Sequence, residues 1–238
     1  MARLFGTDGV RGIANDSLTP ELAYHLGRAA AYIFGQNKEH PTFLIGRDTR
    51  RSGTMLADIL AAGIASAGGD CYMVGVIPTP AIAYLTRTHH MDAGVMISAS
   101  HNPFEYNGIK FFDGFGYKLP DETEDKIEEC MLKDERAALQ SRPTGAAIGT
   151  ISTWTDLQQE YADFICKSTD VDLSGLKVVH DGANGSASVL GPEILKRLGA
   201  EVIAIHHEPN GININDNCGS THLESLKQTV LKKGRRDC

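Results

Sequence analysis

A serine at the end of a short apolar run is the strongest candidate in this sequence for a reacting group. Residues 94–97 are apolar and predict a buried strand, and Ser100, His101 and Asn102 follow directly, closed by Pro103. In open α/β sheets, ligands bind outside the carboxyl ends of the strands. We therefore expect Ser100 to lie at the mouth of a binding site.

The residues around Ser100 leave three chemical interpretations open. A hydrolase nucleophile requires a base in a geometry that the adjacent His101 rarely supplies, and the G-x-S-x-G elbow is absent. An ordinary polar loop that caps a strand is the simplest alternative. A phosphoserine explains the surroundings better, because its charge of roughly −1.5 to −2 requires nearby cations and donors. His101, Asn102 and Lys110 supply both within ten residues.

Lys110 and two glycine-rich loops add further candidates. Lys110 is either an exposed strand-end residue or a proton carrier, since the pKa of a lysine falls readily in a confined site. Residues 5–12 hold Arg11 among glycines, but they lack a Walker pattern, so by themselves they indicate a phosphate loop only weakly. In the second loop, we expect Arg47 and Asp48 to pair with neighbours and fix the turn. Ser52 would then cap the next helix.

Composition narrows the class of protein. The 238 residues are 42% hydrophobic and 22% charged, as is usual for a globular protein. The net charge is −7, and we expect the basic cluster at 232–236 to be a solvated tail, so no nucleic-acid partner is predicted. The five cysteines are odd in number and include no CxxC pair, which argues against a disulfide framework or a zinc site.

The cysteine pattern suits a reducing compartment. The N-terminus lacks the apolar core of a signal peptide, and no window approaches the ~18 apolar residues that span a bilayer. We therefore expect a cytoplasmic protein with no membrane segment.

Strand and helix patterns alternate along the chain. Apolar runs predict strands at 42–46, 71–77, 94–97, 109–112, 176–179 and 201–205. Helical spacing predicts helices at 55–64, from Pro78 onward, at 119–133, 154–165, 189–198 and 221–231, the last with Thr221 as N-cap and Glu224 in a capping box. The alternation predicts an α/β fold, with a mixed or parallel sheet covered by helices on both faces.

The pattern restarts after a polar stretch, which predicts two domains. Residues 134–151 are mostly small and polar and are predicted to form a linker, so we place a first domain at 1–150 and a second at 151–238. The stripe from Trp154 to Ile165 is expected to be core packing and not a cofactor site. The second domain has one β-α-β-α unit and therefore looks incomplete.

Five motifs in order resemble the α-D-phosphohexomutase superfamily. They are FGTDGVRG at 5–12, GRDTR at 46–50, GVMISASHNP at 94–103, NGIKFF at 107–112 and PNGININDNCGST at 209–221. The resemblance covers residues 3–233. It implies a three-layer α/β/α first domain with a mixed sheet, followed by an incomplete second domain of similar type.

The residues of the first and third motifs are most similar to those of bacterial members of the superfamily. Those members interconvert glucosamine 6-phosphate and glucosamine 1-phosphate, on the route to UDP-N-acetylglucosamine and the cell wall. The resemblance implies that Ser100 is phosphorylated and donates its phosphoryl group to the sugar phosphate through a bisphosphorylated intermediate. It also implies a Mg²⁺ ion at the phosphate of Ser100. Phosphoryl transfer depends chiefly on positioning and on neutralising phosphate charge, which such a site would supply.

By the same resemblance, Arg11, His101 and Lys110 line the cleft, with Lys110 as general acid/base and His101 in support. Thr7 and Asn102 belong to the substrate and phosphate environment. The implied partners are small sugar phosphates, and a homodimer is possible.

One expected motif is missing. The acidic Asp-Gly-Asp-Gly-Asp-Arg string that binds the metal in this superfamily should begin shortly after Lys233, and it is absent. The one other D-x-D string, at 170–172, lies in a linker-like segment and receives little weight. We therefore expect an inactive fragment. The alternatives are a phosphomannomutase or phosphoglucomutase of the same superfamily, or a non-catalytic dimerisation or binding module.

Overall fold

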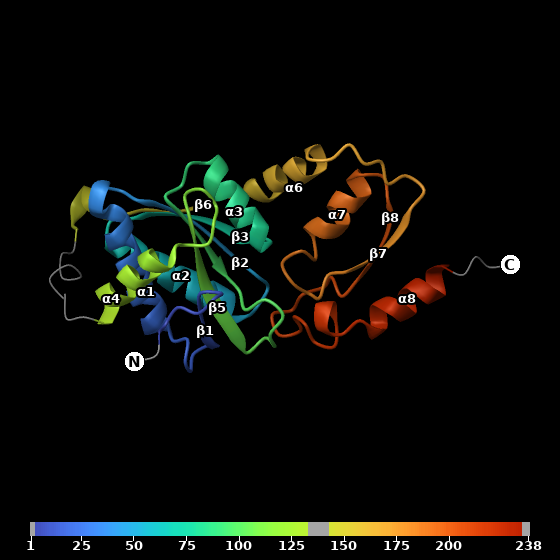
Figure 1. The fold of residues 1–238 in the computed structure, drawn as a ribbon, viewed down its shortest axis with the longest axis horizontal. Coiled ribbons are helices and arrows are strands. Elements are labelled where there is room, and N and C mark those ends of the chain that lie inside the picture. Colours follow the sequence, from blue (N-terminus) through green and yellow to red (C-terminus); the bar gives the residue numbers. More distant parts are fainter. Residues whose placement is uncertain (1–2, 133–142, 235–238) are drawn as a thin grey trace.

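The computed structural model describes residues 3–132 and 143–234. Its main feature is a six-stranded mixed sheet, the first sheet, followed along the chain by a two-stranded second sheet (Figure 1). In spatial order, the strands of the first sheet are β1 (Val10–Ile13), β5 (Tyr106–Asp113), β4 (Ala93–Ile97), β2 (Thr42–Arg47), β3 (Asp70–Val76) and β6 (Ile151–Thr153). The predicted mixed α/β fold is confirmed.

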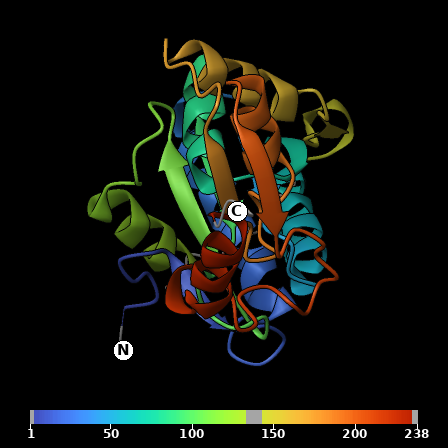
Figure 2. The ribbon, with the colours of Figure 1, turned by 90° about the vertical axis from the view of Figure 1, so that its right-hand side faces the viewer.

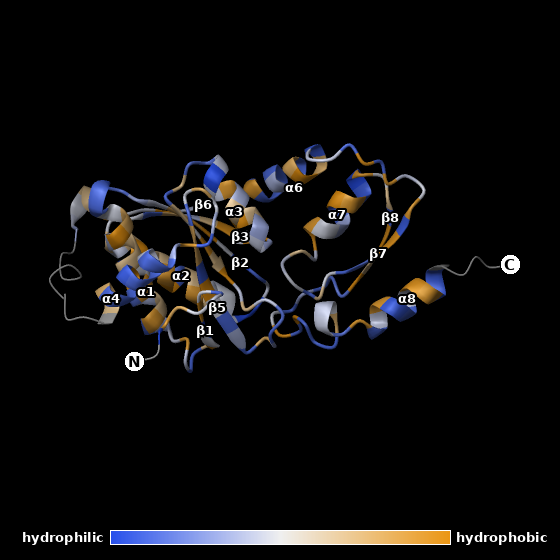
Figure 3. Ribbon diagram, in the orientation of Figure 1, coloured by the Kyte–Doolittle hydropathy of each residue, from blue (hydrophilic) through white to orange (hydrophobic). Residues whose placement is uncertain are grey.

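Helices cover both faces of the first sheet and create two apolar clusters. One face carries α1 (Pro20–Phe34), α2 (Ser52–Ser66) and α4 (Asp121–Leu132), and the other carries α3 (Thr79–Thr88) and α6 (Leu157–Lys167). Neighbouring residues of one strand enter opposite clusters: Phe43 and Ile45 face α1 and α2, whereas Leu44 faces α3. Figure 3 shows the strands between the two helix layers largely in the hydrophobic colour.

The alternation in β4 and β5 decides which side chains reach the functional face. Val95 and Phe111 enter the cluster under α1 and α2, while Met96 and Phe112 enter the cluster under α3. Lys110 is the register partner of Met96 across the antiparallel β4–β5 pair. Because opposite residues of an antiparallel pair point to the same face, Lys110 lies on the α3 face of the sheet.

The sequence did not predict α1 and β1, nor the short strand β6. In α1, Thr19 accepts a hydrogen bond from the Leu22 N–H at 3.2 Å and Pro20 occupies the first turn, which are ordinary signals of a helix start. β1 has no apolar run, since Val10 is its one buried residue. It forms because its backbone pairs with β5 in antiparallel register, a long-range interaction that no local pattern announces.

The second sheet pairs β7 (Lys177–Asp181) with β8 (Glu201–Ile205) in parallel, and Figure 2 shows these strands side by side at the front of the view. Between them lies α7 (Leu190–Arg197), and after them come the short η3 (Gly219–Thr221) and α8 (Glu224–Gly234). The predicted order of strand, helix, strand and helix is confirmed.

The division into domains at residue 150 stays a prediction, although the first sheet extends past it. β6 pairs with β3, which places residues 151–153 in the first sheet. The predicted packing role of the following aromatic stripe is confirmed, because the Phe164 ring stacks on Tyr84 with centroids 3.8 Å apart, and Trp154 lies 4.4 Å from Tyr72. Residues 134–142, the first half of the expected linker at 134–151, lie outside the described residues.

Two helix caps predicted from the sequence are wrong. Ser52 is the first residue of α2, and its hydroxyl accepts a hydrogen bond from the Asn107 side-chain amide at 2.9 Å, so it is tied to β5 and not to its own helix. Thr221 ends η3, and α8 begins three residues later at Glu224. Within the described residues, no helix is both long and apolar enough to cross a membrane.

Glycines bring α1 and α2 into close contact. An added Cβ at Gly27 would collide with the carbonyl oxygen of Leu60, and one at Gly63 would collide with the carbonyl oxygen of Tyr24. Both obstacles are backbone atoms, which cannot rotate away. The two helices can therefore cross at this distance only because neither carries a side chain there.

We predict that Gly63→Ala destabilises the fold by about 1–3 kcal/mol, the usual cost of overpacking. Gly53→Ala, in the same helix, is the control, because its Cβ would meet a side-chain atom, Arg47 Cδ, at 3.2 Å and not a backbone atom, and alanine favours a helix by about 0.5–1 kcal/mol. Urea unfolding of both variants measures the difference. Equal midpoints would show that the helix crossing tolerates a methyl group.

Candidate active site

Ser100 stands on a loop whose backbone is held in an unusual conformation. It lies in the serine loop (residues 98–105), between β4 and β5, and its φ is 56°. A non-glycine residue with φ in this left-handed region is uncommon and persists where the surroundings hold it. The Ser100 side chain is exposed, so the loop turns its hydroxyl outward.

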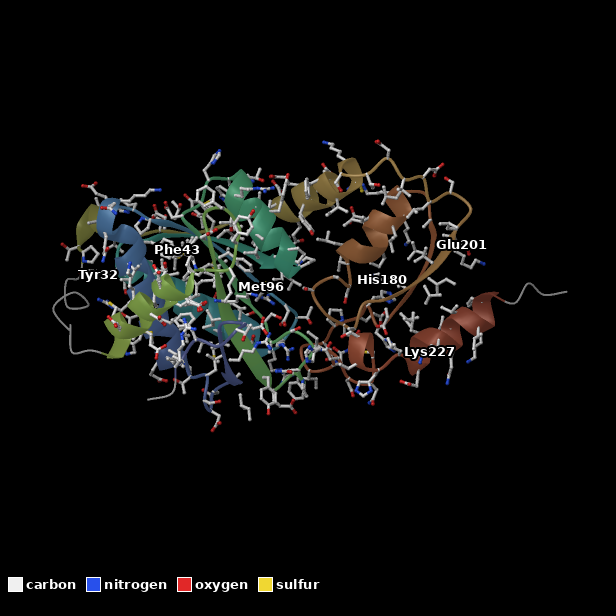
Figure 4. The ribbon with its side chains drawn as sticks, in the orientation of Figure 1. Tyr32, Phe43, Met96, His180, Glu201 and Lys227 are labelled. Carbon is white, nitrogen blue, oxygen red and sulfur yellow. The ribbon has the colours of Figure 1, made fainter. Side chains whose placement is uncertain are left out.

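A cavity of about 280 Å³ opens beside Ser100 on the α3 face of the sheet. It is lined by Asp8, Arg11, Thr79, Met96, Ser98, Ser100 and Lys110. Figure 4 shows Met96, near the end of β4, on the side of the molecule toward the second sheet, whereas Phe43 at the start of β2 lies away from it. The structure therefore brings three of the predicted residues, Arg11, Ser100 and Lys110, into one cavity.

Two cations and one carboxylate set the charge of this cavity. Asp8 contacts Arg11 through Oδ2–Nη2 at 3.4 Å and Lys110 through Oδ1–Nζ at 3.6 Å. The Lys110 ammonium also lies 5.6 Å from the centroid of the Phe112 ring. These ion pairs are partly exposed and long, so each stabilises the fold little. The cavity keeps a net positive charge and suits an anionic group.

Arg50 is buried beneath the serine loop and uses every donor it has. Its side chain is 0% exposed, and its Nε donates to Asp48 at 2.9 Å. Nη2 donates to the carbonyl oxygens of Ser100 at 3.0 Å and Asn102 at 2.9 Å, and Nη1 donates to those of Pro103 and Tyr106. A guanidinium has five N–H donors, and all of them are satisfied here.

Asp48 completes this support from the other side. Its Oδ2 accepts a hydrogen bond from the Ser98 hydroxyl at 2.7 Å, and that hydroxyl oxygen in turn accepts the Ser100 N–H at 3.1 Å. Its Oδ1 accepts the Arg50 N–H at 3.0 Å. The predicted role of Asp48 in fixing its turn is thus confirmed. The same carboxylate also holds the serine loop, through the Ser98 hydroxyl.

The remaining predicted residues lie around the cavity and not in it. His101 Nδ1 is 3.5 Å from Ser100 Oγ, and the His101 side chain lines a neighbouring cavity of about 430 Å³. The Asn102 carbonyl is held by Arg50 and by the Asn215 side-chain amide at 3.0 Å. Thr7 is exposed in the first loop and is not among the described residues that line the Ser100 cavity.

Sequence reasoning did not single out Asp8, Thr79, Arg50 or Asn215. Thr79 stands in the Pro-Thr-Pro start of α3, a sequence that by itself indicates only the beginning of a helix, and it lines the Ser100 cavity. Arg50 and Asn215 both lie inside quoted motifs, but the groups that they hold on the serine loop are backbone carbonyls. A backbone carbonyl carries no sequence signal, so only the fold reveals these contacts.

The described residues do not by themselves fit the predicted Mg²⁺ ion. Mg²⁺ prefers near-octahedral oxygen ligands, usually carboxylates together with phosphates and water. Asp8 is the one carboxylate among the described residues that line the Ser100 cavity, and two cations already pair with it. A phosphate on Ser100 would add oxygens but no further carboxylate. We therefore assign no step to the ion.

Asp181, His206 and Cys218 form a separate cluster whose donor atoms lie within 4.8 Å of one another. The Asp181 carboxylate is already the acceptor for the N–H groups of Ala183 at 2.9 Å and Gly219 at 3.0 Å, and for His206 Nδ1 at 3.1 Å. Burial alone raises the pKa of Asp181, but these hydrogen bonds outweigh it and leave the pKa below its usual value. The cluster therefore joins the end of β7 to the segment that follows β8.

The chain is similar to known proteins in sequence and in fold. Residues 2–138 match the family model described as "Phosphoglucomutase/phosphomannomutase, alpha/beta/alpha domain I". The chain is 55% identical over 234 residues to a phosphoglucosamine mutase of Thermoanaerobacter sp. (strain X514), and this match covers 98% of the chain and 52% of the relative. The chain thus spans about half the length of the curated relatives it matches.

Solved structures give the same result for the fold. A phosphoglucomutase/phosphomannomutase family protein from Burkholderia thailandensis superimposes with a TM-score of 0.80 at 26% identity, over 97% of this chain and 49% of that one. The Aspergillus fumigatus N-acetylphosphoglucosamine mutase, solved with GlcNAc-6P and magnesium, has a TM-score of 0.51 at 14% identity, over 94% of this chain and 45% of that one. At that identity, the second likeness concerns the fold alone.

We predict that Arg50→Lys destabilises the protein by about 3–5 kcal/mol, because one ammonium cannot replace a five-donor fork and leaves buried groups unpaired. Arg51→Lys is the control, since Arg51 is exposed and such surface changes usually stay within about 0.5 kcal/mol. Chemical denaturation of the two variants measures this. If both variants unfolded at the wild-type midpoint, the conclusion that the Arg50 guanidinium supports the serine loop would be wrong.

The lowered pKa of Asp181 predicts a pH-dependent contribution to stability. A carboxyl whose pKa is depressed by folding stabilises the native state above its unfolded pKa of about 3.9 and loses that contribution as the pH falls through the folded value. Wild type should therefore exceed Asp181→Asn in unfolding free energy at pH 6, and the gap should close below about pH 4. The exposed Asp170→Asn is the control. A gap that does not change with pH would contradict the prediction.

Proposed function

The chain belongs to the phosphoglucomutase/phosphomannomutase family, and on that premise we propose that the protein of which it forms a part is a phosphoglucosamine mutase. The proposed reaction interconverts glucosamine 6-phosphate and glucosamine 1-phosphate. Its support is the 55% identity with a relative of that name. The second candidate is a phosphomannomutase or phosphoglucomutase, since the family model carries both names.

One observation carries the proposal: Ser100 is exposed, in a left-handed conformation, beside a cavity that also holds Arg11 and Lys110. Arg50 holds the backbone of the loop through the carbonyls of Ser100 and Asn102. An ordinary polar loop would need neither the clamp nor the two cations. The arrangement suits a serine that carries a phosphoryl group in one stage of the reaction and receives one in another.

In the proposed transfer, a sugar hydroxyl attacks the phosphorus of phosphorylated Ser100. The new O–P bond forms as the bond between Ser100 Oγ and phosphorus breaks. Lys110 gives a proton to the departing serine oxygen and, now neutral, takes up the proton of the attacking hydroxyl, so it ends the step protonated as it began. When the other phosphate of the intermediate returns, Ser100 Oγ attacks it, and Lys110 moves the proton from Oγ to the departing sugar oxygen. Arg11 holds phosphate oxygens, and the charges of both residues offset the charge that is transferred.

The other predicted residues have supporting roles in this proposal. His101, 3.5 Å from Ser100 Oγ, assists the proton transfer from the neighbouring cavity, and Thr7 and Asn102 belong to the loops that surround the phosphate. Magnesium at the serine phosphate would offset further negative charge, with its remaining ligands supplied by groups other than the described carboxylates. A reducing, cytoplasmic setting and a homodimer remain part of the proposal.

We predict that Ser100→Ala, in the whole protein that contains this chain, lowers isomerisation of glucosamine phosphate by at least about 10³-fold, because no other group can carry the phosphoryl. The same change should abolish the mass increase of about 80 Da that one phosphate adds. Ser168→Ala is the control, since that exposed hydroxyl donates to the nearby Ile165 carbonyl and lies outside the Ser100 cavity.

Mannose and glucose phosphates assayed alongside decide between the two candidates, and glucosamine phosphate should give the highest kcat/KM. The 238-residue chain alone is expected not to turn over, because its cavity offers one carboxylate. Undiminished isomerisation by Ser100→Ala would refute the proposed function.

A further inference from the structure

We propose that Asn215 is a positioning residue for Ser100: its side-chain amide, carried on the loop after β8, fixes the backbone of the serine loop from the side of the second sheet. The proposal rests on the proposed function, in that it takes Ser100 as the reacting group. Asn215 touches no reacting atom. It acts through the loop that presents Ser100.

Both donors of the Asn215 amide are used on the serine loop. Nδ2 donates to the Ser100 carbonyl at 2.9 Å and to the Asn102 carbonyl at 3.0 Å. The same two carbonyls accept Arg50 Nη2 at 3.0 and 2.9 Å. A carbonyl oxygen has two lone pairs, so each is shared between a donor from the first sheet and a donor from the second.

The serine loop requires such support because of its backbone. Ser100 has a φ of 56°, and Asn215 itself has a φ of 60°. Asparagine tolerates the left-handed region better than most residues, whereas serine there depends on its surroundings. Removing one of the two clamps therefore leaves the other to hold the loop alone, and the loop gains alternative conformations.

Asn215 is anchored firmly on the second sheet. Its N–H donates to the Ala183 carbonyl at 2.9 Å. The Asp181 carboxylate, at the end of β7, accepts the N–H groups of Ala183 and Gly219, which stand on the two sides of this contact. Any shift of β7 and β8 relative to the first sheet thus moves the Asn215 amide with them.

Two further contacts join the same parts of the chain. Thr49 Oγ1 donates to the Asn184 carbonyl at 2.6 Å, and the Arg51 N–H donates to the Gly211 carbonyl at 2.8 Å. Like the Asn215 contacts, they are directional hydrogen bonds to backbone carbonyls. The serine loop is therefore held by Arg50 alone or by both Arg50 and Asn215, depending on the position of the second sheet. In this way the position of the second sheet affects the geometry of Ser100.

The test compares two substitutions of Asn215 with the same substitutions of Asn217. Asn215→Gly keeps access to positive φ while removing the amide, and Asn215→Asp keeps the shape but replaces both donors by acceptors facing carbonyl oxygens. Asn217 is the matched control, because it shares the loop and a φ of 52°, yet within the described residues its amide donates to the neighbouring Asp216 at 2.8 Å and not to the serine loop.

Hydrogen exchange in the 238-residue chain is the first measurement. Peptides covering residues 99–106 should exchange about tenfold faster in Asn215→Gly and Asn215→Asp than in wild type, whereas the Asn217 variants should stay within about twofold. The global unfolding midpoint, measured in parallel, separates loop release from general destabilisation. Equal exchange of this segment in the Asn215 and Asn217 variants would overturn the proposal.

Kinetics of the whole protein are the second measurement. Asn215→Asp should lower kcat about tenfold and leave KM within about twofold, since the substrate contacts remain while the reacting group is misplaced. A change in KM alone would contradict a positioning role. The hydrogen-exchange result does not depend on activity. If the wild-type whole protein had no mutase activity, the proposed function would be refuted, and the hydrogen-exchange comparison would still decide whether Asn215 holds the serine loop.

Discussion

The buried pair of Arg50 and Asp48 is the interaction on which the candidate site depends. A loop that leaves a strand and turns back carries carbonyl groups with no partner in the sheet, and burying them unpaired is costly. Arg50, with a fully buried side chain, donates to four such carbonyls and to Asp48. The carboxylate neutralises the guanidinium and, through Ser98, also holds the Ser100 N–H. The loop's polar backbone is thus satisfied inward, which leaves its serine hydroxyl facing out.

Arg11 and Lys110 both reach the Ser100 cavity because the first sheet is mixed. β5 returns antiparallel to β4, so Lys110 comes to lie opposite Met96, and β1 returns antiparallel to β5, which brings Arg11 to the same edge. The strand period of two then puts these side chains on the α3 face, away from the cluster that contains Val95 and Phe111. One positive cavity results from four segments of the chain: residues 8–11, Thr79, residues 96–100 and Lys110.

The second sheet contributes to this site through polar contacts with the serine loop. The amide of Asn215 meets the same carbonyls as Arg50, and Thr49 and Arg51 add hydrogen bonds nearby. Hydrogen bonds weaken steeply when their distance or angle changes, so these contacts depend closely on the position of the second sheet. Residues that contact no substrate can therefore affect the chemistry by way of the loop they hold.

Strands such as those at 42–46 and 201–205 could be predicted from the sequence, because apolar periodicity is a local property. The motif around Ser100 indicated the chemistry, because the types and order of its residues can be identified directly in the chain. β1 could not be predicted, since one buried valine gives no periodic signal and the strand exists through its pairing with β5. Arg50 and Asn215 were present in the motifs, but their function lies in hydrogen bonds to carbonyls about 50 and 115 residues away. Every residue has a carbonyl, so the sequence does not mark which ones need a donor. Only the folded backbone, by burying those particular groups, decides that.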